Sequence, residues 1–192
     1  MKKMRMKHTT HLFFVFSGLF ILSLVQGCNA HLQPTTPGGK APVITNSYAI
    51  EKGRFGDVLK IYVEADDPDN DMLRIATVVE QPGFGRHPAD WIFLKSPYRG
   101  HFAGYLRWHT SSAYTSFLSE WTSITIKVSV FDKTGRESNV VVFPFEFVSE
   151  VIKNPPPPSP FDQGSTPMLG NIMINLYEPS RIGGDGNERP ED

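Results

Sequence analysis

Apolar and polar residues alternate with a period of two along the central part of the chain. Residues 58–65 show it most clearly, with Leu59, Ile61 and Val63 on one face and charged or polar residues between them. Residues 123–132 and 140–148 repeat the pattern. Alternation of this kind is typical of β-strands with one buried face. Pro144 falls on the outward face of the last run, where it predicts an edge strand or a bulge because proline cannot donate to a sheet.

Shorter runs rich in apolar residues are separated by turn signals rich in Gly, Pro, Asn and Asp. No long segment has the 3.6-residue period of a helix, so the pattern predicts an all-β fold. We expect a single antiparallel β-sandwich over residues 42–150 with about seven short strands. The expected strands are residues 43–45, 58–65, 73–79, 91–94, 101–108, 123–132 and 140–148.

The N-terminus has the layout of an export signal. Four basic residues and no acidic ones precede residue 28, and residues 12–25 form an apolar run of 14 residues, too short to span a bilayer as a helix. The run ends in Leu24-Val25-Gln26-Gly27-Cys28, which resembles a bacterial lipobox. We therefore expect a signal peptide over residues 1–27 and a lipid on Cys28. The open alternative is an ordinary signal peptide or a short anchor helix, with Cys28 incidental.

The lipobox resemblance implies a bacterial lipoprotein. Cys28 would carry a diacylglycerol thioether and usually an amide-linked acyl chain such as palmitate, and two or three chains hold a protein stably in a membrane. Asn29 follows the cysteine, where an aspartate would resemble an inner-membrane retention signal. The expected location is the bacterial outer membrane, facing the periplasm or the cell surface.

The segments that flank the expected domain have irregular compositions. Residues 28–41 read as the lipidated cysteine and a flexible tether, and residues 151–167 as a stiff Pro-rich linker. Residues 168–177 are apolar enough to dock as an extra strand or to meet a partner, and residues 178–192 have the composition of a disordered tail.

Three motifs, in this order, resemble immunoglobulin-like and cadherin-like bacterial surface domains. They are the acidic turn at residues 65–71 (ADDPDND), the tryptophan strand at residues 104–108 (GYLRW) and the strand at residues 126–135 (IKVSVFDKTG). The resemblance implies an immunoglobulin-like β-sandwich and covers residues 42–148. Asn70 stands where those domains usually have glycine, a change that turns tolerate.

Composition narrows the classes of function. The formal charge is −1, and it becomes −5 once the basic signal peptide is removed, which argues against nucleic acid as a partner. Cys28 is the only cysteine, so acylation leaves no thiol for a zinc site, a disulfide or a nucleophile. No nucleophile elbow, paired-histidine helix, phosphate loop or dinucleotide fingerprint occurs, so we expect no enzyme activity.

Two groups of residues remain as candidate sites. In the acidic turn, calcium could take oxygens from Asp66, Asp67, Asp69 and Asp71, with Asp132 nearby, although four aspartates also suit a plain solvated turn. No other cofactor is expected.

The second candidate lies among ten aromatic residues between Phe84 and Trp121. Packing is expected for Trp91, Phe102 and Trp108. We predict that Tyr98, Tyr114 and Trp121 form an exposed aromatic platform that binds glycan.

The pattern as a whole predicts a non-catalytic, membrane-anchored lipoprotein whose immunoglobulin-like interaction domain holds an envelope protein or helps to assemble a surface complex. The alternative is a ligand-binding module for glycan or calcium. The two differ in an observable feature, because a binding module exposes aromatic side chains in a row whereas a scaffold buries them.

Overall fold

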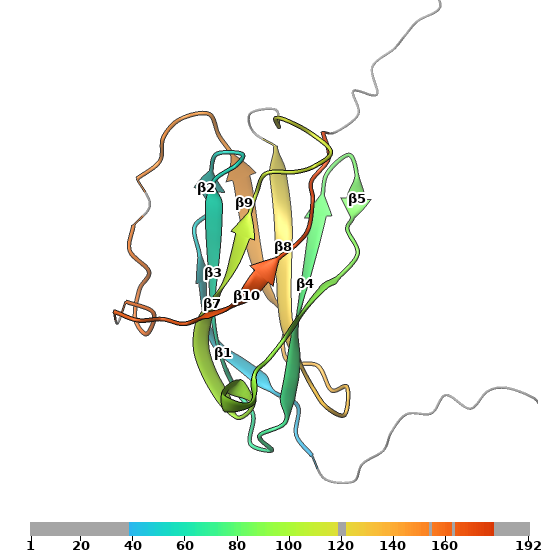
Figure 1. Cartoon of the computed structure of the whole chain (residues 1–192), viewed down its shortest axis with the longest axis vertical. Helices are drawn as coiled ribbons and strands as arrows, with labels where there is room; N and C mark the ends of the chain where they lie inside the picture. The colour runs from blue at the N-terminus through green and yellow to red at the C-terminus, as the bar shows by residue number, and fades with distance from the viewer. Residues whose placement is uncertain (1–38, 119–121, 154, 163, 179–192) are drawn as a thin grey trace, which may run out of the picture. The chain divides into compact units, whose positions relative to one another are not determined.

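Two facing β-sheets form a sandwich in the computed structural model, which describes residues 39–118, 122–153, 155–162 and 164–178 (Figure 1). One sheet has the strand order β1-β3-β7-β10. The other has the order β2-β9-β8-β4-β5, with β6 also paired to β4. The expectation of an all-β sandwich is confirmed. Cys28 and Trp121 lie outside the described residues.

Seven of the strands overlap the runs that the sequence predicted. The first sheet consists of β1 (Val43–Ala49), β3 (Val58–Asp66), β7 (His101–His109) and β10 (Met168–Ile172). The second consists of β2 (Lys52–Gly53), β4 (Met72–Gln81), β5 (Gly85–Arg86), β6 (Asp90–Phe93), β8 (Ser123–Asp132) and β9 (Val141–Phe147). A short 3-10 helix, Ser96–Tyr98, precedes β7. The strands β2 and β5 have two residues each, too few to show a period.

The core lies between the sheets and is made by the inward positions of the alternating strands. From the first sheet it receives Leu59, Ile61, Val63, Ala65, Phe102, Leu106 and Trp108. From the second it receives Ile75, Val79, Ile124, Ile126, Val128, Val130, Phe143, Phe145 and Phe147. Packing was correctly expected for Phe102 and Trp108. Trp91 is 38% exposed instead, because Ile92 and Leu94 take the inward positions and Arg74 stacks on the indole ring from outside.

Two strand pairs depart from the purely antiparallel sheet that was expected. β10 runs parallel to β7, and β2 runs parallel to β9. Both pairs join segments distant in sequence, whereas a tight hairpin can only join antiparallel strands. On β9, Pro144 lies opposite Thr125 of β8, while β2 reaches only Glu146 and Phe147. Within the described residues, Pro144 therefore occupies a free edge, as its chemistry requires.

The compact unit does not end near residue 150. After β9 the Pro-rich segment crosses the outer face of the first sheet, where Phe161 is buried with its ring 5.4 Å from that of Tyr62. β10 then pairs with β7 of the same chain, and the residues that follow place Ile174 and Leu176 in the core. The described C-terminal segment is therefore part of the fold.

Candidate functional site

Gln81, the last residue of β4, organises one end of the sandwich. It is 1% exposed, and its side-chain amide binds the backbone of Tyr177, accepting from the N–H at 3.1 Å and donating to the C=O. The same amide oxygen lies 3.1 Å from His87 Nε2, which must donate because this oxygen can only accept. One buried side chain thus joins β4, the segment after β5 and the C-terminal segment.

A tight turn places Phe84 beside that clamp. Residues 81–84 (QPGF) carry proline at the second position and Gly83 at the third, with φ of 81°, and Phe84 N–H donates to the Gln81 C=O at 3.0 Å. These are the features of a type II turn, which needs glycine at its third position. β5 then pairs back onto β4, and His87 N–H donates to Val79 C=O at 2.9 Å.

Tyr114 arrives from the loop that follows β7. Ser112 Oγ donates to Leu176 C=O at 2.6 Å and accepts from Tyr114 N–H at 3.0 Å. Ala113 N–H donates to Asn175 Oδ1 at 3.0 Å. Hydrogen bonds therefore join the loop to the C-terminal segment, and they place the Tyr114 ring against the Tyr177 ring.

Four rings meet at this end of the sandwich. Tyr177 stacks on Phe84 with centroids 4.3 Å apart and planes at 6°, and on Tyr114 at 4.6 Å and 8°. The imidazole of His87 stacks on Phe84 at 4.4 Å. Phe84 is 45% exposed and Tyr114 63% exposed, so the stack stands at the surface.

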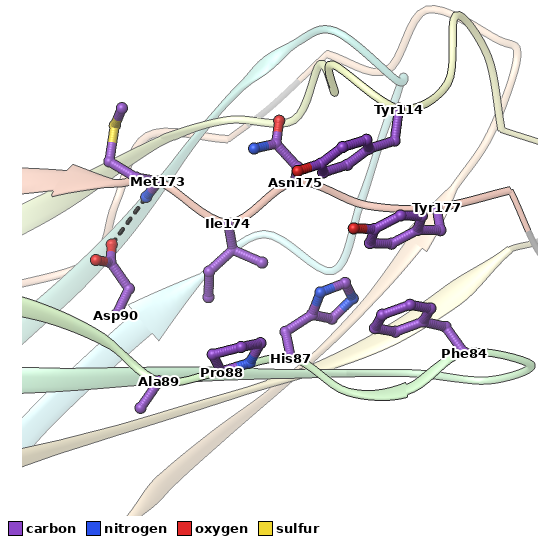
Figure 2. Close-up of a pocket in the computed structure, with 10 residues that line it drawn as sticks. All are labelled: Phe84, His87, Pro88, Ala89, Asp90, Tyr114, Met173, Ile174, Asn175 and Tyr177. Atoms are coloured by element: carbon purple, nitrogen blue, oxygen red, sulfur yellow. Dashed lines mark hydrogen bonds between the residues drawn. The ribbon is translucent and has the colours of Figure 1, made fainter.

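The stack forms one end of an open groove of about 310 Å³, which we call the aromatic groove (Figure 2). One side follows the chain from Phe84 to Asp90, and the other follows the C-terminal segment from Met173 to Tyr177. At the far end, Asp90 Oδ2 accepts from Met173 N–H at 2.8 Å. The lining residues are Phe84, His87, Pro88, Ala89, Asp90, Tyr114, Met173, Ile174, Asn175 and Tyr177.

The groove carries little charge. Burial lowers the pKa of His87 below its ordinary value of 6.5, so the ring is neutral at neutral pH. Burial, helped by a hydrogen bond with Tyr114, raises the pKa of Tyr177, so its hydroxyl stays protonated. Asp90 is then the one charged side chain among the ten lining residues.

The depressed pKa of His87 predicts a pH-dependent stability. The unfolded chain takes up a proton at this histidine at higher pH than the folded chain does, so the free energy of unfolding falls as the pH drops below about 6.5. We expect a smaller fall in His87→Gln than in the unaltered protein, measured by urea unfolding between about pH 7.5 and pH 5. His109→Gln is the control, because the His109 side chain is exposed. Equal pH dependence in the two variants would contradict the assignment.

The structure separates the aromatic residues that the sequence grouped as a platform. Tyr98 lies in the 3-10 helix before β7 and packs partly against the core, whereas Tyr114 follows the other end of β7. A nine-residue strand is about 26 Å long, so Tyr98 and Tyr114 cannot touch one ligand ring. Trp121 is not among the described residues. Of the two described residues, Tyr114 lines the groove and Tyr98 does not.

The acidic turn brings its aspartates together with backbone donors. Asp67 is 3% exposed and accepts from the N–H groups of Asp69 and Asp71, both at 3.0 Å. Asp132 accepts from the N–H of Thr134 and of Arg136, both at 2.8 Å. Both carboxylates therefore cap turns.

The carboxyl group of Asp71 in this turn and the neighbouring carboxyl group of Asp132 at the end of β8 differ in acidity. Burial alone would raise the pKa of Asp132, but the hydrogen bonds from Arg136 and Thr134 outweigh it and hold that pKa below 3.8. Burial first, then the hydrogen bond with Asp67 and the neighbouring charges, raise the pKa of Asp71.

Asp66 and Asp69 point to other partners. Asp66 Oδ1 lies 2.8 Å from His101 Nδ1, and Asp69 Oδ2 accepts from Lys40 N–H at 2.5 Å. Among the described residues no group of three or more His, Cys, Asp or Glu side chains is placed to hold a metal ion. Calcium binding by Asp66, Asp67, Asp69, Asp71 and Asp132 stays a prediction.

Sequence reasoning did not find Gln81, His87 and Tyr177 as site residues. Phe84 was noted as one aromatic among ten, and Tyr177 as the end of an apolar segment. The available signal was local: a proline-glycine turn that ends in an aromatic residue. Its partner lies 96 positions after Gln81, and no spacing rule connects the two.

The chain matches no protein-family model and no curated protein. Among solved structures, it resembles the PKD domain of an M14-like peptidase from Thermoplasmatales archaeon SCGC AB-540-F20, with 15% sequence identity and a TM-score of 0.39. That likeness covers 58% of this chain and 100% of that domain. The fold described above rests on the strand pairing of this chain itself. In the part of the chain that the structure describes, no helix is both long and apolar enough to cross a bilayer.

Proposed function

We propose that this chain is a non-catalytic bacterial lipoprotein, anchored in the outer membrane through Cys28, whose β-sandwich is a ligand-binding module. The aromatic groove is its binding site. The basic start, the short apolar run and the lipobox-like residues 24–28 support the anchor. The tether over residues 29–41 would give the domain reach from the membrane.

The exposed ring stack is the observation that favours a binding module over a scaffold. A scaffold would bury large aromatic side chains, since each buried ring contributes to the stability of a domain that has no disulfide. Here Phe84 and Tyr114 stay 45% and 63% exposed, although they are stacked in line with Tyr177. Exposed aromatic side chains gathered in a concave site are a common mark of ligand binding.

The groove is also held in shape before any ligand arrives. Gln81 fixes Tyr177, Ser112 fixes the Tyr114 loop, and Asp90 fixes Met173. A site that is ordered in advance loses less entropy on binding, which raises affinity.

The test uses bacterial cells that lipidate and export the full chain. In the first arm, Cys28→Ser is expected to abolish incorporation of a palmitate analogue and to release the protein from the membrane fraction. In the second arm, a diazirine amino acid replaces Met173, which lines the groove and is 77% exposed. Illumination is expected to give a covalent adduct in the envelope.

The matched control carries the same diazirine at Phe93, which is 64% exposed and does not line the groove. Equal labelling of Cys28→Ser and the unaltered chain would refute the anchor. Adducts at position 93 as strong as those at position 173, or none at either, would refute the groove as the binding site.

A further inference from the structure

We propose that the ligand of the aromatic groove is a neutral oligosaccharide. This assignment rests on the proposed function, because it names the ligand class of the same site. Three properties of the groove carry it: its charge, the free face of one ring, and the polar groups beside that ring.

The charge of the lining favours an uncharged ligand. The ten lining residues include no lysine or arginine, and His87 is buried and neutral. A phosphate or carboxylate would meet Asp90 without a counter-charge, at an electrostatic cost. A neutral chain meets no such penalty, and Asp90 can accept hydrogen bonds from its hydroxyl groups, since each carboxylate oxygen has a further lone pair.

Tyr114 offers a flat apolar face at the end of the groove where the rings stack. One face of its ring covers Tyr177, and the side chain as a whole is 63% exposed. The C–H face of a pyranose ring packs on such a surface, and tyrosine provides it with little loss of side-chain freedom because the stack below holds the ring.

Hydrogen-bonding groups stand beside this ring, as a sugar requires. The hydroxyl ends of Tyr114 and Tyr177 both point toward the interior of the groove (Figure 2). Asn175 uses its Oδ1 on Ala113 N–H, and its amide nitrogen has no hydrogen-bond partner among the described residues. A neighbouring pair of sugar hydroxyls can exchange donors and acceptors with such groups.

The open form of the groove suits an internal part of a chain. Its volume of about 310 Å³ is at the lower end for ligand sites, and its side is open to solvent. A polymer can lie across it without placing an end group inside. A small apolar ligand would stay largely in water.

The experiment is a titration of the full chain, in a detergent without a sugar headgroup, followed by NMR of the Asn175 and Tyr177 amides. The probes are cellotetraose and chitotetraose as neutral chains, tetragalacturonate as an anionic chain, and a proline-rich peptide. We expect a neutral chain to shift both amides saturably below roughly 10 mM. Tyr114→Ala should weaken this binding at least about tenfold, and Tyr114→Phe less, while Phe93→Ala should not change it.

Several results would overturn the assignment. They are no response to either neutral chain, a response unchanged by Tyr114→Ala, or tetragalacturonate binding as tightly as the neutral chains. If the peptide alone binds, the ligand is not an oligosaccharide, but the groove remains the binding site. The same conclusion follows if position 173 forms adducts in the envelope while no sugar shifts the two amides. If position 173 forms no adduct and no probe binds, the proposed function itself is refuted.

Discussion

Replacing Leu176 with alanine is expected to lower the free energy of unfolding by about 2–5 kcal/mol. The Leu176 side chain is 0% exposed and belongs to the same core cluster as Trp108 and Ile126. Truncation removes apolar surface from the core and leaves a cavity that close-packed neighbours fill only in part. Urea unfolding followed by tryptophan fluorescence measures the change.

Met173→Ala is the matched control for Leu176→Ala. It lies three residues earlier in the same segment, but its side chain is 77% exposed, so the expected change is within about 0.5 kcal/mol. Similar small effects for both variants would mean that the segment after β10 does not pack in solution. The groove, four of whose lining residues follow β10, would then have no fixed C-terminal side.

The central strands could be predicted because their information is local. In residues 58–65 and 123–132 the alternation of apolar and polar residues is long enough to show which face of the strand is buried. Leu59, Ile61, Ile124 and Ile126 are buried as expected. Residues 91–94 (WIFL) are all apolar, so their sequence does not say which face points inward. Trp91 was therefore misplaced, and the pairing of β6 with β4 decides its face.

The Pro-rich segment shows a different limit. Its composition predicts an extended chain, but an extended chain can be either a free linker or a segment that packs across a sheet. What makes this segment pack is Phe161, whose ring contacts Tyr62 on the outer face of β3. Tyr62 in turn lies opposite Tyr48 and Tyr105 on the neighbouring strands, and such cross-strand rows become visible only once the register is known.

The groove could not be predicted because contacts distant in sequence create it. Phe84 and Tyr114 sit on separate loops, and Tyr177 joins them only after the chain has crossed the first sheet. The acidic turn, by contrast, was easy to see, since its four aspartates all lie between residues 66 and 71. In the structure, Asp67 and Asp132 accept hydrogen bonds from backbone N–H groups. The run of aspartates that stands out in the sequence therefore reflects the preference of aspartate for turns.

Binding and folding are linked in this arrangement. Met173, Asn175 and Tyr177 belong to the segment whose docking also buries Ile174 and Leu176. A ligand that contacts the groove binds only the docked state, and it therefore stabilises that state by mass action.

Replacing Gln81 with alanine is expected to lower the free energy of unfolding by about 2–4 kcal/mol and to detach Tyr177. The substitution leaves the Tyr177 N–H and C=O and the His87 Nε2–H without their partner. Polar groups left unpaired away from water cost more than the hydrogen bonds themselves contribute. Urea unfolding measures the first effect, and hydrogen exchange of the Tyr177 amide measures the second.

The neighbouring residue provides the control that separates a buried clamp from a surface contact. Glu80 pairs with Lys127 Nζ at 2.6 Å, but their side chains are 40% and 37% exposed, so Glu80→Ala should cost only about 0–1 kcal/mol. It should also leave exchange of the Tyr177 amide slow. If Gln81→Ala costs no more than Glu80→Ala, the amide does not hold the C-terminal segment. If stability falls while Tyr177 stays protected, the segment is held by its core residues Ile174 and Leu176, and the ring stack survives without the clamp.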